Sequence, residues 1–220
     1  MKTYLLAIVT AALFASGCSS KKNEPKPAAD STNANSYLPV APGNTWTYND
    51  AVPSYGTSIE TTKMVGGTLA INSKNYYTQQ NDSPVNGITT NYFYADNHTY
   101  AVRTSNYPTS LAIELILGND SYPVGYSWTT TPTDDGILFG YPTHTVNTIK
   151  EKNIPVTVNG KTFVNVIHTQ VSFEQDAGGG FKSKGTYDFY LAKGIGLIEK
   201  ITQLSFQPYE KETLIDYTVK

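Results

Sequence analysis

The segment from Val156 to Phe173 constrains the fold most, because it has the pattern of two β-strands joined by a two-residue turn. Asn159-Gly160 supplies the two positive-φ residues that a type I′ turn needs. Apolar and polar residues alternate along the second strand, so Phe163 is expected on one face and His168 on the other. The segment therefore predicts an antiparallel hairpin with one buried face.

Strand-length runs separated by turn residues continue along the rest of the chain after residue 36. Tyr, Thr and Val favour strands, and the chain has 17 Tyr against two Met. The run 111–117 fits a strand or a short buried helix, and the early Gly118-Asn119 favours the strand. No helical periodicity exceeds two turns, so the predicted fold class is all-β. Strands are expected at 58–65, 68–71, 75–79, 88–95, 99–104, 111–117, 156–158, 162–173, 187–192, 196–206 and 213–219, with Gly66-Gly67 as the turn between the first two.

The first 17 residues have the features of a secretory signal peptide. Lys2 precedes an apolar run, Tyr4 to Phe14, which is shorter than the roughly 20 residues of a membrane-spanning helix. Ala15-Ser16-Gly17-Cys18 follows and resembles a bacterial lipobox, with small residues before the only cysteine. The resemblance implies cleavage before Cys18 and acylation of this residue with fatty acids such as palmitate. The alternative is an ordinary signal peptide that a cysteine happens to follow.

Residues 18–36 are expected to form a disordered, acylated tether between the membrane and a β-rich domain at 37–220. After Cys18 the tether contains no aromatic or branched aliphatic residue, so it cannot join a hydrophobic core. Asp30-Ser31-Thr32 resembles the short sites that some bacteria O-glycosylate in the periplasm, which makes Ser31 a candidate site. The alternative is ordinary linker polarity.

Composition and motif spacing exclude several classes of function. The net charge is −2 and only 15% of residues are charged, so no basic surface for nucleic acid is expected. His98, His144 and His168 lack the spacing of a zinc site, and there is no G-x-S-x-G nucleophile motif. We therefore predict no metal, no cofactor and no catalytic residue. A Ser-His-Asp site assembled from distant residues stays open.

Acidic residues offer a second route to chemistry, because two carboxylates at a suitable separation can hydrolyse glycosides. Asp134-Asp135-Gly136 fits a turn better than a calcium loop, since the other oxygen ligands of an EF-type loop are missing. Nothing in the sequence selects a catalytic pair. Acids in predicted strands that could converge are Glu60, Glu114, Glu174, Asp188 and Glu199.

Tyrosines crowd one third of the chain. Adjacent tyrosines in a strand point to opposite faces, so one ring of each pair faces outward or lines a concavity. Such rings suit a half-exposed strand surface, and they also suit a concave face for a lipid, glycan or peptide. The candidates for ligand-facing aromatic residues are Tyr76, Tyr77, Tyr92, Tyr94 and Tyr100.

Four motifs together resemble a broad group of lipoproteins common in Bacteroidota-type bacteria. They are Tyr37-x-Pro39 with Gly43-Asn44-x-Trp46-x-Tyr48, Val124-Gly125-x-Ser127-Trp128, Val158-Asn159-Gly160-Lys161-Thr162-Phe163-x-Asn165-Val166, and Tyr190-x-Ala192-Lys193-Gly194-Ile195-Gly196-Leu197-Ile198. The likeness runs in order through residues 37–203. It implies a single, strongly curved antiparallel sheet or an incomplete barrel, and a location at the outer membrane. The group has no agreed activity.

The leading hypothesis is a non-enzymatic envelope lipoprotein whose curved sheet binds an apolar ligand, a glycan or another protein. The alternatives are a hydrolase of envelope or dietary polymers and a purely structural component. An enzyme is expected to gather titratable groups with perturbed pKa values in a pocket, whereas a binder is expected to show a groove lined by Tyr, Phe and Leu. Ser19-Ser20-Lys21-Lys22 stands where surface-exported members of the group carry acidic residues, so the periplasmic face of the outer membrane is favoured.

Overall fold

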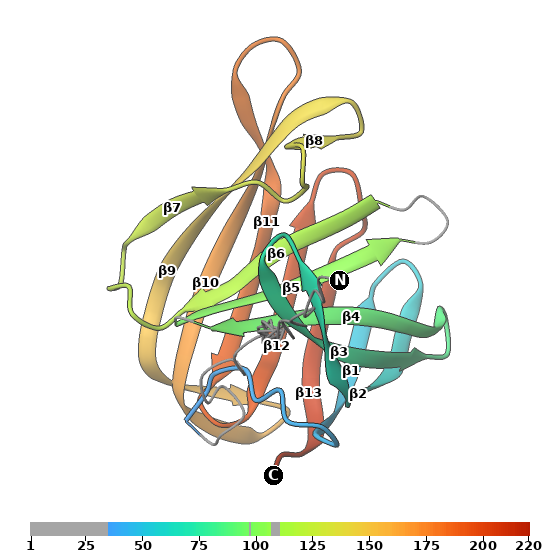
Figure 1. Ribbon diagram of the computed structural model, residues 1–220. Coiled ribbons are helices and arrows are strands. Elements are labelled where there is room, and N and C mark those ends of the chain that lie inside the picture. The colour runs from blue at the N-terminus through green and yellow to red at the C-terminus, as the bar shows by residue number, and fades with distance from the viewer. Residues whose placement is uncertain (1–34, 97, 107–110) are drawn as a thin grey trace, which may run out of the picture.

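The computed structural model describes residues 35–96, 98–106 and 111–220, which form thirteen β-strands and no helix (Figure 1). This part of the chain therefore contains no helical membrane span. The predicted signal peptide, Cys18 and Ser31 lie outside the described residues. The strands are β1 (Thr45–Val52), β2 (Gly56–Ile71), β3 (Lys74–Ser83), β4 (Gly87–Asp96), β5 (Thr99–Asn106), β6 (Leu111–Asn119), β7 (Ser127–Thr130), β8 (Ile137–Leu138), β9 (Tyr141–Val158), β10 (Lys161–Asp176), β11 (Phe181–Ala192), β12 (Gly196–Leu204) and β13 (Glu210–Thr218).

The strands form one antiparallel sheet, which confirms the predicted fold class. The order across it is β6-β5-β4-β3-β2-β1-β13-β12-β11-β10-β9-β7, and β8 pairs with β9 beside this path. The first and last strands pair with each other, so that Asp50 of β1 lies opposite Glu212 of β13. Because β6 and β7 lie at opposite ends of the order, the sheet curves strongly without closing into a barrel (Figure 1).

The hydrophobic core lies on the concave side, where the two arms of the sheet meet. β6 packs against β9, β10 and β11. Gly118 of β6 permits this approach, because a Cβ at this position would lie 3.3 Å from both Leu191 Cδ1 and Thr169 Oγ1. The chain before β1 covers one end of the core, with Leu38 and Val40 buried. Residues with no exposed surface at the centre of the core are Ile149, Val166, Ile167, Leu191, Ala192 and Ile198.

The predicted hairpin at residues 156–173 is confirmed, but its first strand is much longer than expected. The prediction of a single buried face was wrong, because bulges interrupt the pairing and residues 166–169, including His168, are all buried. Asn159 and Gly160 adopt φ values of 49° and 77°, and Val158 pairs with Lys161. β9 extends back to Tyr141, although only 156–158 were predicted as strand. The buried face of the extension carries Thr145 and Asn147, which have no exposed surface. Because these buried residues are polar, hydropathy does not alternate along β9.

The prediction of two strands at 58–65 and 68–71 was wrong, since β2 runs unbroken from Gly56 to Ile71. Gly66-Gly67 forms a bulge instead of a turn: the pairing steps from Met64 opposite Gln79 to Thr68 opposite Tyr77. Both glycines have positive φ, 86° and 78°. Glycine tolerates such values in a bulge as well as in a turn, so the local sequence does not distinguish the two.

The motif residues around Trp46 hold the start of the sheet against the β11–β12 turn. The indole Nε1–H of Trp46 donates a hydrogen bond of 2.6 Å to the carbonyl oxygen of Ile195. Gly196 packs beneath this ring, because a Cβ there would lie 3.4 Å from Trp46 Nε1 and 3.5 Å from Pro39. The glycine therefore allows the close packing that these distant segments need.

Candidate functional site

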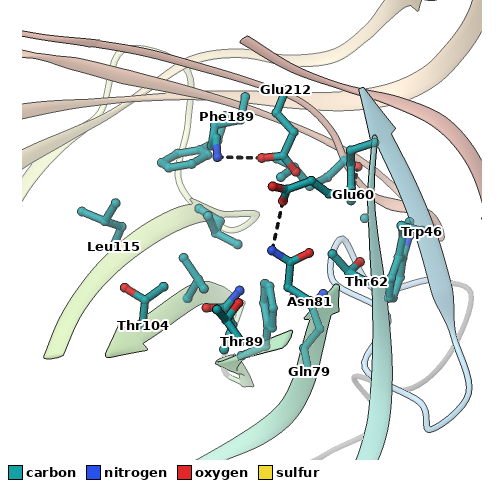
Figure 2. Close-up of a pocket in the computed structure, with 18 of the residues that line it drawn as sticks. Trp46, Glu60, Thr62, Gln79, Asn81, Thr89, Thr104, Leu115, Phe189 and Glu212 are labelled. Carbon is teal, nitrogen blue, oxygen red and sulfur yellow. Dashed lines mark hydrogen bonds and ion pairs between the residues drawn. The ribbon is translucent and has the colours of Figure 1, made fainter. Parts of the chain in front are cut away.

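A cavity of about 910 Å³ lies on the concave side of the sheet. Strands β1 to β6 contribute one wall and β11 to β13 the other, and Figure 2 shows side chains from both walls pointing into the space between them. Small-molecule sites typically have volumes of about 300–1,000 Å³. The labelled lining residues are Trp46, Glu60, Thr62, Gln79, Asn81, Thr89, Thr104, Leu115, Phe189 and Glu212.

Strand alternation selects the polar side chains that enter the cavity, because every second residue points inward. Cross-strand pairing then arranges three of them in a row. Asp50 of β1 lies opposite Glu212 of β13, which lies opposite Lys200 of β12. Glu210, two residues before Glu212, also lines the cavity. Charged groups that are far apart in the sequence therefore meet inside the sheet.

Lys200 is held between two carboxylates. Its Nζ lies 2.9 Å from Glu210 Oε1 and 2.6 Å from Glu212 Oε2. Burial disfavours the ammonium charge, but the attraction of Glu212 and Glu210 outweighs it and raises the pKa of Lys200. Burial also opposes the charge of Glu210, and Lys200 overcomes this effect and lowers the pKa of Glu210. Lys200 therefore stays protonated and is no candidate nucleophile.

At Asp50, by contrast, the surroundings disfavour the charged form of the side chain. Burial and repulsion from Glu210 raise its pKa from 3.8 to about 6, although Lys200 opposes the shift. Repulsion from Glu212 and Glu60 adds to the rise. The pKa of one acid in the cavity is thus raised, while Lys200 lowers the pKa of its neighbour Glu210.

Three buried oxygen atoms that border the cavity have no hydrogen-bond partner among the described residues: Asp50 Oδ1, Thr62 Oγ1 and Asn81 Oδ1. Thr62 is only 6% exposed. The other end of the Asn81 amide is paired, since its Nδ2 donates to Glu60 Oε2 at 3.0 Å (Figure 2). Buried polar groups are nearly always paired, and an unpaired one costs about 1–3 kcal/mol. Each of these atoms has almost no exposed surface, so its side chain must rotate before it can bond with a molecule in the cavity.

Apolar side chains complete the lining. Trp46, Leu117 and Phe189 are buried, whereas Phe93 and Leu115 are partly buried. Phe189 belongs to the wall formed by β11 to β13, and the other four belong to the wall formed by β1 to β6. An acidic part and an apolar part thus lie within one cavity. This combination suits a molecule that is itself amphiphilic.

The five predicted tyrosines do not line the cavity. Tyr76 and Tyr100 are buried, and their hydroxyl groups donate to Glu114 and Asp120, respectively. The ring of Tyr94 packs against Tyr76 at a centroid distance of 5.8 Å. Tyr92 is half-buried, and Tyr77 borders a smaller hollow of about 170 Å³ near Gly66. Whether any of the five meets a ligand stays a prediction.

Each histidine pairs with a carboxylate in the structure. His98 Nδ1 lies 2.5 Å from Asp120, and His144 Nε2 lies 2.9 Å from Glu174. His168 lies between Glu151 and Asp188, at 3.1 and 2.8 Å. No group of three His, Cys, Asp or Glu residues that could hold a metal ion occurs in the part of the chain that the structure describes.

The five acids singled out in the sequence do not converge on one another. Glu114 pairs with Lys74, Glu174 with His144, Asp188 with His168 and Glu199 with Lys211. Of the five, Glu60 reaches the cavity.

The sequence interpretation missed Asp50, Lys200, Glu210 and Glu212. The signal that could have found two of them is the spacing Glu210-x-Glu212, which places both carboxylates on one face of a strand. Their partners come from β1 and β12, and only the pairing of the first strand with the last brings Asp50 to them.

No protein-family model matches the chain, and no curated protein matches it. Two solved structures have a similar overall shape. One is a predicted lipoprotein from Parabacteroides distasonis, with 12% identity over 83% of this chain and 98% of the other and a TM-score of 0.45. The second is a predicted exported protein with a YmcC-like fold from Bacteroides fragilis, with 9% identity over 82% of this chain and 98% of the other and a TM-score of 0.45. At this level, neither likeness bears on the function of this chain.

Proposed function

We propose that the protein is a non-enzymatic lipoprotein of the bacterial cell envelope that binds a small ligand in the interior cavity. Cys18 anchors it to the outer membrane, with the domain on the periplasmic side. The observation that carries ligand binding is the cavity itself, which is of small-molecule size and is bordered by unpaired buried oxygen atoms. The lipobox and the polar tether support the anchored location.

The residues around the cavity favour binding over catalysis. Among the described residues that line it, none is Ser, Cys or His, so the cavity holds no nucleophile paired with an imidazole base. Lys200 is committed to Glu210 and Glu212 by two ion pairs. Aromatic and aliphatic side chains such as Phe93 and Leu115 offer contact area instead of reactive groups.

A hydrolase is the second candidate function, and one observation favours it. The pKa of Asp50 is raised to about 6 beside carboxylates that are ionised in ion pairs, a pattern also found in the general acids of glycosidases. Hydrolysis of an envelope or dietary polysaccharide that Asp50→Asn abolishes would establish this function in place of simple binding.

The anchor is tested by Cys18→Ser in cells that express the full chain. We expect the variant to move from the membrane fraction to the soluble fraction, because acyl chains on Cys18 supply the membrane affinity. Metabolic labelling with a palmitate analogue should mark the unchanged protein and not the variant. A variant that stays in membranes would contradict anchoring.

Ligand binding is tested by blocking the cavity. Thr104→Trp adds an indole on the inner face of β5, and Thr61→Trp adds the same group on the exposed face of β2 as a matched control. Native mass spectrometry of the Cys18→Ser chain purified without detergent should show a bound molecule. We expect Thr104→Trp to lose this molecule and Thr61→Trp to retain it, with both variants folded by circular dichroism. Equal retention by both would overturn the proposed site.

A further inference from the structure

The charge of the cavity is unbalanced. Four carboxylates line it, from Asp50, Glu60, Glu210 and Glu212, against the single ammonium group of Lys200. Lys200 forms its ion pairs with Glu210 and Glu212. Within the described residues, neither Asp50 nor Glu60 forms an ion pair, although Lys200 lies near enough to attract Asp50. The whole chain carries a net charge of only −2, so negative charge is concentrated in this one concave space.

The opposite face of the same strands shows that this imbalance is local. On the outer side of β12 and β13, Glu199 and Lys211 pair one to one, with Nζ 3.1 Å from Oε2. Glu199 precedes Lys200 in the sequence, yet it points away from the cavity. The strand pair therefore carries balanced charge outside and excess acid inside.

The unpaired buried atoms at the same place require hydrogen-bond donors. Asn81 Oδ1 can only accept a hydrogen bond, and the same holds for Asp50 Oδ1 while the carboxyl is ionised. Thr62 Oγ1 can accept one as well. Register places these atoms close to Glu60, because Asn81 bonds to Glu60 and Thr62 lies two residues after it on the same face of β2. A primary ammonium group brings three N–H donors and one positive charge. Such a group would therefore supply both the positive charge that the excess carboxylates attract and the donors that the unpaired oxygen atoms lack.

The apolar residues that line the rest of the cavity indicate that the ammonium group belongs to a molecule with an apolar part. Trp46, which lies opposite Thr62 in the β1–β2 pair, continues from the acidic part toward apolar side chains. Phe93 and Leu115, which are only partly buried, provide an apolar surface there. A molecule with an apolar chain behind its charged head would cover this surface and remove it from water.

We propose that the cavity binds an amphiphilic primary amine, with its ammonium group among Asp50, Glu60, Thr62 and Asn81 and its apolar chain along Phe93 and Leu115. This inference rests on the proposed ligand-binding function and specifies the class of ligand. Ionised Asp50 and Glu60 attract the head group, and the unpaired oxygen atoms accept its N–H groups once their side chains rotate toward it. The apolar wall holds the chain.

The test compares ligands that share one chain and differ in head group. Dodecylammonium, dodecyl maltoside and dodecyl sulfate are titrated into the Cys18→Ser chain below their micelle concentrations, with isothermal calorimetry as the readout and circular dichroism as a check of folding. We expect dodecylammonium to bind at least about tenfold more tightly than the other two. Butylammonium, which lacks the long chain, should bind far more weakly. Added salt should reduce the preference for the cation.

Matched variants locate the head group. Asp50→Asn with Glu60→Gln removes both unpaired charges at nearly constant shape, and Glu199→Gln removes one charge from the outer face. We expect the double variant to lose the preference for dodecylammonium and Glu199→Gln to keep it. If dodecyl maltoside or dodecyl sulfate binds as well as the amine, or if the double variant keeps the preference, the amine inference is wrong while ligand binding stands. If none of the three binds, and Thr104→Trp changes nothing, the binding function itself fails.

Discussion

The concave side of the sheet has two regions that differ in how they are occupied. In the filled region, side chains such as Ile167 and Leu191 pack without exposed surface. In the open region, the cavity lies between walls of mixed character. β12 passes through both on one inward face, since Ile198 is fully buried and Lys200 lines the cavity two residues later.

The contrast shows that strand geometry alone does not decide whether the interior of a curved sheet fills. Apolar side chains from two arms exclude water and pack together. Carboxylates such as Asp50 and Glu60 resist such packing, because burying a charge without an ion-pair partner is costly. The open region therefore persists where the inward positions carry acids and amides.

The largest expected effect comes from making the same truncation in both regions. Leu191→Ala in the filled region should lower the free energy of unfolding by about 2–5 kcal/mol, because it leaves a cavity in a packed core. Leu115→Ala in the wall of the open region should lower it by about 1 kcal/mol, because the side chain is only partly buried. Urea unfolding followed by circular dichroism measures both. Equal losses would mean that the two regions do not differ in packing.

The second effect tests the ion pairs that separate the regions. Lys200→Met leaves Glu210 and Glu212 without their cation, and should cost about 2–4 kcal/mol of stability. Lys211→Met breaks the single pair with Glu199 on the outer face, where the lysine side chain is more exposed than Lys200, and should cost about 1 kcal/mol. Thermal unfolding at neutral pH compares the two variants. A similar cost for both would show that the inner group is solvated like a surface pair.

The third effect is a pH dependence from Asp50. The pKa of this carboxyl rises from 3.8 to about 6 on folding, so ionised Asp50 destabilises the folded state as pH increases through this window. At pH 7, Asp50→Asn should therefore be more stable than the unchanged protein, by about 2 kcal/mol, because solvent around this partly exposed group screens the roughly 3 kcal/mol that such a shift implies. The difference should disappear below about pH 3, where the carboxyl is protonated in both states. A difference that grows toward acidic pH would have the wrong sign for this cause.

The smallest effect marks the boundary between the regions. The hydroxyl group of Tyr48 donates a hydrogen bond of 3.0 Å to the carbonyl oxygen of Leu197. Tyr48→Phe should cost about 1 kcal/mol, as expected for one buried hydrogen bond. Tyr55→Phe, at a site that is 84% exposed, should cost close to nothing. If the two variants unfold at the same denaturant concentration, the Tyr48 hydroxyl does not stabilise this boundary.

The sequence by itself determined the all-β class and the hairpin at Asn159-Gly160, because turn chemistry and alternation are local properties. It did not reveal that β2 is continuous, since positive φ at Gly66 serves a bulge as well as a turn. It also missed most of β9, whose buried Thr145 and Asn147 break the expected alternation.

Only the tertiary structure decided which residues form the candidate site. Asp50 meets Glu212 because β1 pairs with β13, a contact between the two ends of the domain that no local pattern encodes. Phe93 enters the cavity while its neighbours Tyr92 and Tyr94 do not line it. A tyrosine-rich segment indicates a strand, but the direction of each ring depends on the register and curvature of the whole sheet.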